Sequence, residues 1–503
     1  MVHKVSVIGT PGTGKTRKFV EEIKDKLTEA VATSVTLAPI YEIAKRSGFE
    51  PKTLGLRTIY GLAESNLLKD GYLSSDLAKY LNPTYNLRLK RKVAKKIGLR
   101  FMGKDPFDLD IIETGTFETL TVLYTKAIFL KGDYDAVYEF LNEAERFGIT
   151  SRHFDVIYKL YKEGKYYDYS FLILDAWKNQ INIAKYKQGS DTIYFKYVYI
   201  DEAQDLGVIP YKLFELYEDQ YDVFKLFGDP GQTIYQFLGA KPSIILNHGK
   251  REVLNPTWRF GKNIAELGNK ILRKLHFPYK IEYTDKPDRV VVKSFSSEKL
   301  LLDLEAISNK APDWSIAILT RTNSQANLIR RLISKKFAPL PIKDSQRELV
   351  DRVMTAIGNF IMFKKTGSRE YFRRIKSYFG EETKGLMGYL DVQRYKNISI
   401  GEFLLRVEQK LFNRRLQWLE EVVIKLLKGF KEIYVDTIHS AKGLEFDVVI
   451  IYDEIPKLIR QFISENPKYL REEMFVYYTA ITRARRLLKI YLRPVNYYEA
   501  IFC

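Results

Sequence analysis

The chain has 503 residues, 46% of them hydrophobic, which is enough for about three to four domains with apolar cores. Lys and Arg total 81 against 62 Asp and Glu, and the net charge of +19 favours a polyanionic partner such as nucleic acid. A single cysteine, Cys503, excludes disulfides within the chain and cysteine metal clusters, while the lack of a signal peptide or of about 18 consecutive apolar residues predicts a cytoplasmic protein without a membrane span.

The first element predicted from the sequence is a phosphate-binding loop. The stretch GTPGTGKT fits the pattern G-x-x-x-x-G-K-[ST] and lies between a strand-like segment (2–8) and an amphipathic helical segment (17–27). Backbone N–H groups of such a loop curl around an anion at the helix N-terminus, Lys15 would reach the outer phosphates, and the Thr16 hydroxyl would bind Mg²⁺. The residues expected at the nucleotide are Gly9, Thr10, Pro11, Gly12, Thr13, Gly14, Lys15 and Thr16.

A strongly basic helical segment follows. The stretch RLKRKVAKKIGLR, residues 88–100, carries seven basic residues. It is consistent either with contact to duplex phosphates or with a solvated helical face, and the sequence leaves both open.

An acidic turn ends the next strand-like segment, residues 192–200. Asp201, at the tip of that strand, can hold Mg²⁺, and Glu202 can orient and deprotonate an attacking water. The alternative is an acidic helix N-cap, since Asp and Glu favour that position, and both roles are compatible.

The stretch LFGDPGQTIYQFLGA, residues 226–240, places a glutamine beside two aromatic residues. Asp229 and Gln232 can serve a phosphate site, whereas an exposed Tyr235 or Phe237 can serve a nucleobase. Taken alone, the stretch favours the simpler interpretation of a strand end, a turn and a helix start with core aromatics.

The second half of the chain offers arginines that could stabilise phosphate charge, Arg259 and Arg483, although an isolated arginine is more often a solvated surface charge. Two strand–turn units lie between them, in residues 315–332 and 432–454. The first turn carries Arg321 and Asn323, and the second carries Thr437, His439, Lys442 and Glu445.

The order and the sequences of these segments resemble the conserved motifs of superfamily 1 helicases of the UvrD/Rep/PcrA type, over the range from Gly9 to about Arg485. GTPGTGKT resembles motif I, TIYGLA (58–63) motif Ib, DEAQD motif II and GDPGQTIYQFLGA motif III. NPTWRF resembles motif IV, with AILTRTNSQ following it, VDTIHSAKGLEFDVVI resembles motif V, and VYYTAITRAR resembles motif VI.

The resemblance implies an α/β fold with two RecA-like parallel-sheet lobes, each interrupted by a mostly helical insertion, with ATP and Mg²⁺ bound between them. It assigns Mg²⁺ to Asp201 with Thr16, general-base catalysis to Glu202, and sensing of the γ-phosphate to Gln232. Arg259 and Arg483 become the arginine fingers of the second lobe, Trp258 packs on the adenine and Glu445 meets the ribose. Single-stranded DNA is expected at Tyr235, Phe237, Arg321, Asn323, Thr437, His439, Thr58 and Tyr60.

The expected domain organisation has six parts. The first lobe covers 1–79 and 166–248 around an insertion at 80–165, and the second lobe covers 249–344 and 431–503 around a reduced insertion at 345–430. Helical patterns such as REYFRRIKSYF and LEEVVIKLLKGF mark the second insertion, and no room is expected for an appended nuclease.

Two departures from the family pattern stand out. The glutamine-containing segment that reads adenine ahead of motif I is not expected here, which predicts that GTP and dATP are used within about tenfold of ATP. In addition, Pro39 and Ile40 occupy the motif Ia region where a base-contacting Phe is expected, with Tyr41 as a candidate substitute.

The favoured function is therefore an ATP-dependent helicase moving 3′ to 5′ on single-stranded DNA and on junctions with duplex, as a monomer, with a loading partner from replication or repair. The alternatives are a translocase that strips proteins from DNA without processive unwinding, and a nucleotide-switched DNA-binding module. The presence of Glu202, Gln232, Arg259 and Arg483 argues against the switch, because a switch could lose the base.

Overall fold

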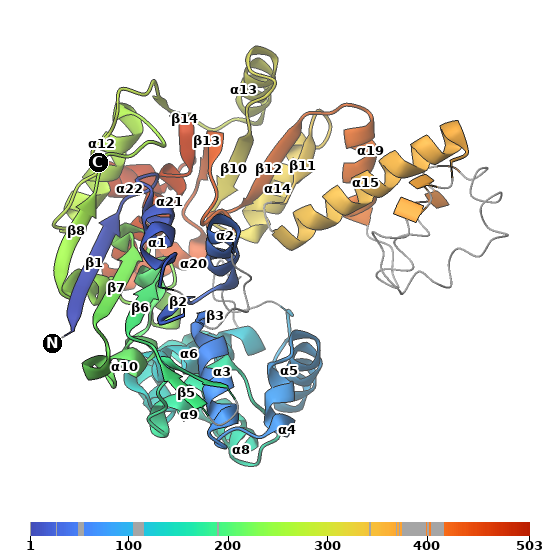
Figure 1. Cartoon of the computed structure of the whole chain (residues 1–503). Helices are drawn as coiled ribbons and strands as arrows, with labels where there is room; N and C mark the ends of the chain where they lie inside the picture. The colour runs from blue at the N-terminus through green and yellow to red at the C-terminus, as the bar shows by residue number, and fades with distance from the viewer. Residues whose placement is uncertain are drawn as a thin grey trace. The chain divides into compact units, whose positions relative to one another are not determined.

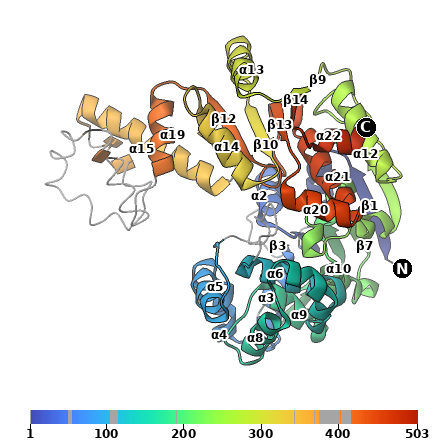
Figure 2. The same ribbon diagram turned by 180° about the vertical axis from the view of Figure 1, so that it is seen from behind.

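The computed structural model contains mixed α/β structure with two six-stranded sheets (Figures 1 and 2). It describes residues 2–26, 28–48, 55–103, 115–188, 191–341, 344–368 and 417–503, together with positions 370–371, 373–374, 399 and 402–403. The chain forms two compact units. The first comprises Met1–Val291, Ile455–Leu488 and Asn496–Cys503, and the second comprises Val292–Glu454 and Lys489–Val495.

The first sheet has the strand order β3-β2-β6-β7-β1-β8, and its strand pairs are parallel. Its strands are β1 (His3–Gly9), β2 (Ala30–Ser34), β3 (Leu56–Thr58), β6 (Tyr197–Ile200), β7 (Val223–Gly228) and β8 (Lys250–Leu254). Runs such as Val5–Ile8, which is apolar apart from Ser6, are buried because both faces of a parallel sheet are covered by helices. The strand β8 pairs with β1, whereas we expected the second lobe to begin at residue 249.

Helices of two groups belong to the first unit. Those directly connected to the sheet strands or following them are α1 (Lys15–Ile23), α2 (Leu37–Ser47), α3 (Ile59–Lys69), α10 (Val208–Glu215), α11 (Pro242–Asn247), α12 (Lys262–Lys274), α20 (Lys457–Glu465), α21 (Lys468–Ile481) and α22 (Tyr497–Phe502). A helical layer adds α4 (Ser75–Ala78), α5 (Pro83–Ile97), α6 (Phe117–Lys131), α7 (Leu141–Arg146), α8 (Ser151–Lys162) and α9 (Tyr169–Lys178). Both views show α3, α5, α6, α8 and α9 grouped together (Figures 1 and 2).

The centre of the helical layer is α6, which is buried on nearly every side, as expected for a helix with apolar residues all around it. The Thr116 side chain caps its N-terminus by accepting a hydrogen bond from the Thr119 backbone N–H at 3.2 Å. Gly132 ends it at a φ of 71°, and a Cβ there would lie 2.3 Å from Trp177 Nε1, so only glycine fits. A short antiparallel hairpin, β4 (Lys185–Gln188) and β5 (Asp191–Tyr194), follows α9.

The second sheet has the order β11-β12-β10-β13-β14-β9. Its strands are β9 (Arg289–Ser294), β10 (Ile316–Thr320), β11 (Ala338–Leu340), β12 (Glu432–Thr437), β13 (Phe446–Asp453) and β14 (Ala484–Leu492), and the division between the units falls within β9 and β14. Its helices are α13 (Ser297–Lys310), α14 (Asn323–Ile333), α15 (Asp344–Thr366) and α19 (Gln417–Leu427).

The expected second insertion begins with α15 and ends with α19, and most of the stretch REYFRRIKSYF lies outside the described residues. Of the helices in the described part of the chain, none combines the length and apolar character needed to cross a membrane.

Candidate nucleotide-binding site and nucleic-acid surfaces

The glycine-rich loop between β1 and α1 has the backbone that its sequence predicts. Gly12 and Gly14 have φ values of 82° and 85°, in the left-handed region that favours glycine. The Lys15 ammonium donates to the Gly9 carbonyl at 2.6 Å, so the lysine folds back over the loop. The Thr10 hydroxyl oxygen is buried and makes no hydrogen bond within the described part of the chain, which suits a loop that receives a polar ligand.

The acidic turn after β6 lies in the same sheet, separated from β1 by β7. Asp201 is buried, and its Oδ1 accepts a hydrogen bond from the Glu202 backbone N–H at 2.9 Å. Burial raises the pKa of Asp201 to about 7, and repulsion from Glu202 adds to this while the Lys15 ammonium opposes it. A divalent cation would favour the ionised carboxylate, so the donor set fits Mg²⁺.

Glu202 has a φ of 51°, a conformation that a non-glycine residue seldom adopts. The Gln204 side chain donates from Nε2 to Glu202 Oε2 at 2.5 Å and accepts at Oε1 from the Asp229 backbone N–H at 3.2 Å. Gln204 therefore fixes the Glu202 carboxylate and links the turn after β6 to the turn after β7.

The turn after β7 is organised around Asp229, which the sequence offered beside Gln232 as able to serve a phosphate site but which was not among the predicted site residues. Its Oδ1 accepts from the Tyr279 hydroxyl at 2.9 Å and from the Gly231 backbone N–H at 3.0 Å. Its Oδ2 accepts from the Tyr478 hydroxyl at 3.0 Å and from Gln232 Nε2 at 3.2 Å. Burial raises the pKa of Asp229, and the two tyrosine hydroxyls act against that rise. We call Asp229, Tyr279 and Tyr478 the tyrosine clasp.

A segment after β8 lies against the tip of the phosphate loop. The Trp258 backbone N–H donates to the Gly12 carbonyl at 2.9 Å, and the Thr257 hydroxyl donates to the Pro11 carbonyl at 2.5 Å. A Cβ at Gly12 would lie 2.5 Å from the Arg259 Cβ, so glycine is required for this approach as well as for its φ. The Trp258 side chain is 61% exposed, which leaves its ring available for stacking.

The two predicted arginine fingers meet at the end of α21. Arg259 Nη1 donates to the Thr482 carbonyl at 3.0 Å, while Arg483 Nε donates to the Thr479 carbonyl at 3.1 Å. Arg483 is almost fully buried despite its charge, which is unusual for a solvated surface arginine. Both arginines lie in the same compact unit as the phosphate loop, whereas the resemblance placed them in the second lobe.

Residues expected at DNA in the first unit differ in exposure. Tyr235 is buried and Phe237 is half-buried, and their rings meet edge to face with centroids 6.1 Å apart. The Tyr60 ring packs on Phe129 and Tyr169 at 6.5 and 5.1 Å. The Thr58 hydroxyl caps α3 by accepting from the Gly61 backbone N–H at 3.1 Å, so it has a structural role whatever else it contacts.

The second unit holds the remaining predicted residues. Asn323 begins α14 two residues after Arg321, which is buried, and Thr437 ends β12 opposite Thr320 of β10. His439 is buried in the turn that follows β12, and Glu445, expected at the ribose, is exposed there.

The basic segment 88–100 forms most of α5 and its C-terminal end. Val93, Ala94 and Leu99 are buried, whereas most of the basic side chains point to solvent: Arg88, Arg91, Lys92, Lys95, Lys96 and Arg100 are exposed. The helix thus has a narrow buried edge and a broad cationic surface, and contact with phosphates stays a prediction.

Sequence reasoning missed Thr257, Tyr279 and Tyr478, and it left Asp229 out of the predicted site residues. Asp229 directly follows β7 in the stretch LFGDPGQTIYQFLGA, and its position at a strand tip is the signal that could have selected it. The tyrosines gave no local signal, because their hydroxyls reach Asp229 from positions 50 and 249 residues further along the chain.

Two segments of the chain match family models of helicase domains. Residues 118–252 match the UvrD/REP helicase N-terminal domain, and residues 406–493 match the UvrD-like helicase C-terminal domain. A probable DNA helicase II homolog of Mycoplasma genitalium is 24% identical over 386 residues, which cover 59% of this chain and 54% of that protein. ATP-dependent DNA helicase UvrD2 of Mycobacterium tuberculosis (strain H37Rv) is 21% identical over 328 residues, covering 57% and 46%.

The chain therefore spans about half the length of these curated relatives. Among solved structures, the Arterivirus nonstructural protein 10 helicase with DNA matches at 12% identity and a TM-score of 0.33, covering 99% of this chain and 63% of that chain.

Proposed function

The two family-model matches make this chain a superfamily 1 helicase of the UvrD/Rep type, and on that premise we propose that it is an ATP-driven motor that moves 3′ to 5′ along single-stranded DNA and unwinds duplexes. Its proposed cofactors are ATP and Mg²⁺, and its proposed substrates are single-stranded DNA and junctions with duplex. We further propose that 80–165 and 345–430 are insertions in the two lobes, and that the motor acts as a monomer.

One observation carries the proposal. The phosphate loop, the acidic turn and the turn containing Gln232 all follow the carboxyl ends of β1, β6 and β7, which are neighbours in one parallel sheet. Ligands of open α/β sheets bind at that edge. Arg259 and Arg483 add positive charge in the same unit, as phosphoryl transfer requires.

The proposed roles follow from what each side chain contacts. Lys15 would exchange its bond to the Gly9 carbonyl for the outer phosphates. Asp201 and Thr16 would hold Mg²⁺, which supplies charge neutralisation at the phosphates when bound. Glu202, whose carboxylate Gln204 already fixes, would orient the attacking water and accept its proton.

The turn containing Gln232 would couple hydrolysis to the strand. Gln232 is bonded to Asp229 and would shift that bond when a γ-phosphate is present or lost. Phe237 lies five positions further along and is half-buried, so its ring could stack on a base. We propose Tyr235, Tyr60, Thr58, Arg321, Asn323, Thr437 and His439 as the other DNA contacts.

The test is a pair of assays on the purified chain. ATP hydrolysis is measured with and without single-stranded DNA, and unwinding is then measured on 3′-tailed and 5′-tailed duplexes side by side. Stimulated hydrolysis with unwinding of the 3′-tailed duplex is the expected result, and Glu202→Gln is the matched inactive control. Stimulation without unwinding of either duplex would favour the protein-stripping translocase, and hydrolysis indifferent to DNA would refute the motor.

A further inference from the structure

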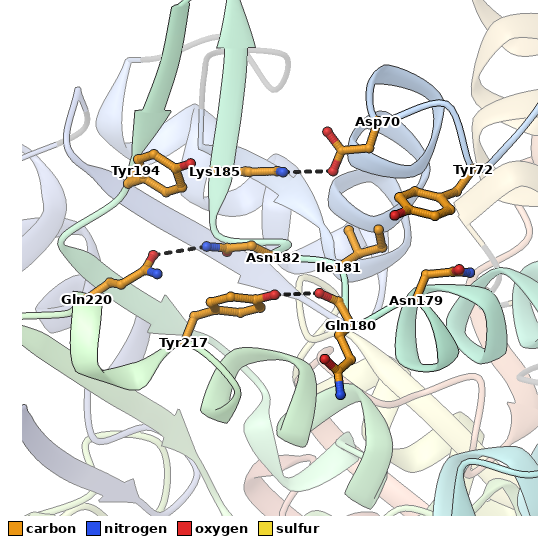
Figure 3. A pocket seen from close by; sticks show the side chains of 10 residues that line it. All are labelled: Asp70, Tyr72, Asn179, Gln180, Ile181, Asn182, Lys185, Tyr194, Tyr217 and Gln220. Atoms are coloured by element: carbon orange, nitrogen blue, oxygen red, sulfur yellow. Dashed lines mark hydrogen bonds and ion pairs between the residues drawn. The ribbon is translucent and has the colours of Figure 1, made fainter.

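A cavity of about 520 Å³ opens in the first unit, away from the nucleotide site (Figure 3). Four separate segments line it: the end of α3, the loop between α9 and β4, the hairpin β4–β5, and the 3₁₀ turn Glu218–Gln220. Its volume lies within the range of small-ligand sites.

The cavity lies toward the edge of the first sheet opposite the phosphate loop. Tyr194 and Gln220 shortly precede β6 and β7, whereas Asp201 and Asp229 directly follow these strands. Since β6 has four residues, its length alone separates the two edges by roughly 13 Å. The cavity is therefore a site of its own and no extension of the ATP site.

An ion pair and two hydrogen bonds connect residues that line the cavity. Lys185 Nζ and Asp70 Oδ2 form an ion pair at 2.7 Å, with side chains only 13% and 12% exposed. The Tyr217 hydroxyl donates to the Gln180 carbonyl at 2.5 Å, and Gln180 has a left-handed φ of 48°. Asn182 Nδ2 donates to Gln220 Oε1 at 3.0 Å. A strained non-glycine backbone that its surroundings hold in place is common at ligand sites.

The surfaces offered to a ligand are aromatic and amide-like. Tyr72 and Tyr194 are 56% and 54% exposed, and they lie on opposite sides of the cavity (Figure 3). The Asn179 amide, whose Nδ2 already donates to the Asp175 carbonyl at 2.9 Å, adds its oxygen as an acceptor and its second N–H as a donor. Lys185, the lysine in the lining, is already paired with Asp70, so the lining favours a flat, uncharged ligand with polar edges over a phosphate.

We propose that this cavity binds one unpaired nucleobase, with its sugar, from single-stranded DNA, while the phosphates stay outside. An aromatic ring stacks on any base, and side-chain amides match the polar edge of a base. The net charge of +19 brings the polyanion to the protein. The choice of DNA as the source of the base rests on the proposed function. The existence and the lining of the cavity are independent of that function.

The first experiment needs no variant. A single-stranded oligonucleotide carrying iodouracil is bound to the full chain without ATP, irradiated, and the crosslinked residues are mapped by mass spectrometry. Crosslinks at Tyr72 or Tyr194 are expected. Crosslinks confined to other residues would overturn the proposal.

The second experiment measures affinity for the same oligonucleotide by fluorescence anisotropy. The double variant Tyr72→Ala with Tyr194→Ala is expected to bind about tenfold more weakly, which corresponds to about 1.4 kcal/mol. Tyr138→Ala serves as the matched control, because Tyr138 is a 41% exposed tyrosine of the same unit outside the cavity. Thermal denaturation checks that the variants are folded.

Tyr194→Phe separates stacking from recognition by the hydroxyl. Wild-type affinity is expected, because the ring remains. Tyr194→Ala is measured beside it, and a loss for Tyr194→Phe as large as that for Tyr194→Ala would overturn stacking as the mode of binding. An unchanged affinity of the double variant would overturn base binding at this cavity. If DNA does not stimulate ATP hydrolysis but crosslinks still form at Tyr72 or Tyr194, the proposed motor function is refuted and the proposed base site is retained.

Discussion

Replacing Tyr478 with Phe tests the tyrosine clasp with the loss of a single oxygen atom. The Tyr478 hydroxyl and Gln232 Nε2 donate to the same carboxylate oxygen of Asp229, at 3.0 and 3.2 Å. In Tyr478→Phe, Asp229 Oδ2 loses the hydrogen bond from the tyrosine hydroxyl and keeps the one from Gln232 Nε2. We expect the free energy of unfolding to fall by about 1.5–3 kcal/mol, the usual worth of a hydrogen bond to a charged group.

The loss of unfolding free energy caused by Tyr478→Phe should depend on pH. Burial raises the pKa of Asp229, so the folded state holds its proton more tightly, and the stability that the group contributes is lost as the pH rises through the folded pKa. Because the tyrosine hydroxyls lower that pKa, Tyr478→Phe raises it further and extends the loss to higher pH. The variant should therefore be more costly at about pH 8 than at about pH 5.5.

Urea unfolding at the two pH values measures this, with Tyr134→Phe as the control. Tyr134 is also fully buried in the first unit, but its hydroxyl donates to the Phe154 backbone carbonyl at 2.9 Å, so its loss should cost about 0.5–1.5 kcal/mol at either pH. If Gln232 senses the phosphate, Tyr478→Phe should also lower kcat by about tenfold, or 1.4 kcal/mol. Equal losses for both variants at both pH values would refute the clasp.

Three further outcomes are expected. Lys15→Ala and Glu202→Gln should each lower the ATPase kcat by at least about a hundredfold yet spare DNA binding, and an anisotropy titration showing parallel loss of DNA affinity would contradict the separation of roles. Trp258→Ala should raise KM for ATP and GTP alike, because an exposed ring stacks on any purine, and a rise for ATP alone would show that it reads the base. His248 contacts the Tyr211 hydroxyl and the Phe224 carbonyl, and burial lowers its pKa to about 4. Its contribution to stability is therefore present above about pH 6.5 and is lost as the pH falls. In urea unfolding, the wild type should lose about 2 kcal/mol relative to His248→Gln between about pH 7.5 and pH 5, and identical pH profiles of the two proteins would disprove this.

The sequence predicted what depends on contiguous residues. The phosphate loop needs Gly12 and Gly14 in left-handed conformations next to a helix start, and a short pattern is enough to specify that. The α/β fold with two parallel sheets was also predicted, and it is confirmed. Asp201 could be placed at a strand tip because the apolar run before it ends there.

The rest depends on contacts between distant residues. That β8 pairs with β1 is decided by the folded sheet and not by residues 250–254 themselves. The tyrosine clasp joins positions 229, 279 and 478, and the cavity of Figure 3 draws on four segments, so neither leaves a local pattern. Burial of the Tyr235 ring is likewise a consequence of packing that its neighbours in sequence do not reveal.

The discontinuity of the first unit has a consequence for how the protein is made. Residues 455–488 and 496–503 complete a unit that begins at the N-terminus, and the ribosome must first synthesise the whole intervening stretch. At about 5–20 residues per second, that delay is roughly 10–40 s. During it, the nascent first unit lacks α21, so Asp229 has no Tyr478 and Arg259 has no Thr482 carbonyl to hold it. A nascent chain that does not yet include α21 therefore carries a phosphate loop without its completed arginine cluster, and the candidate nucleotide site is completed only after Arg483 has been synthesised.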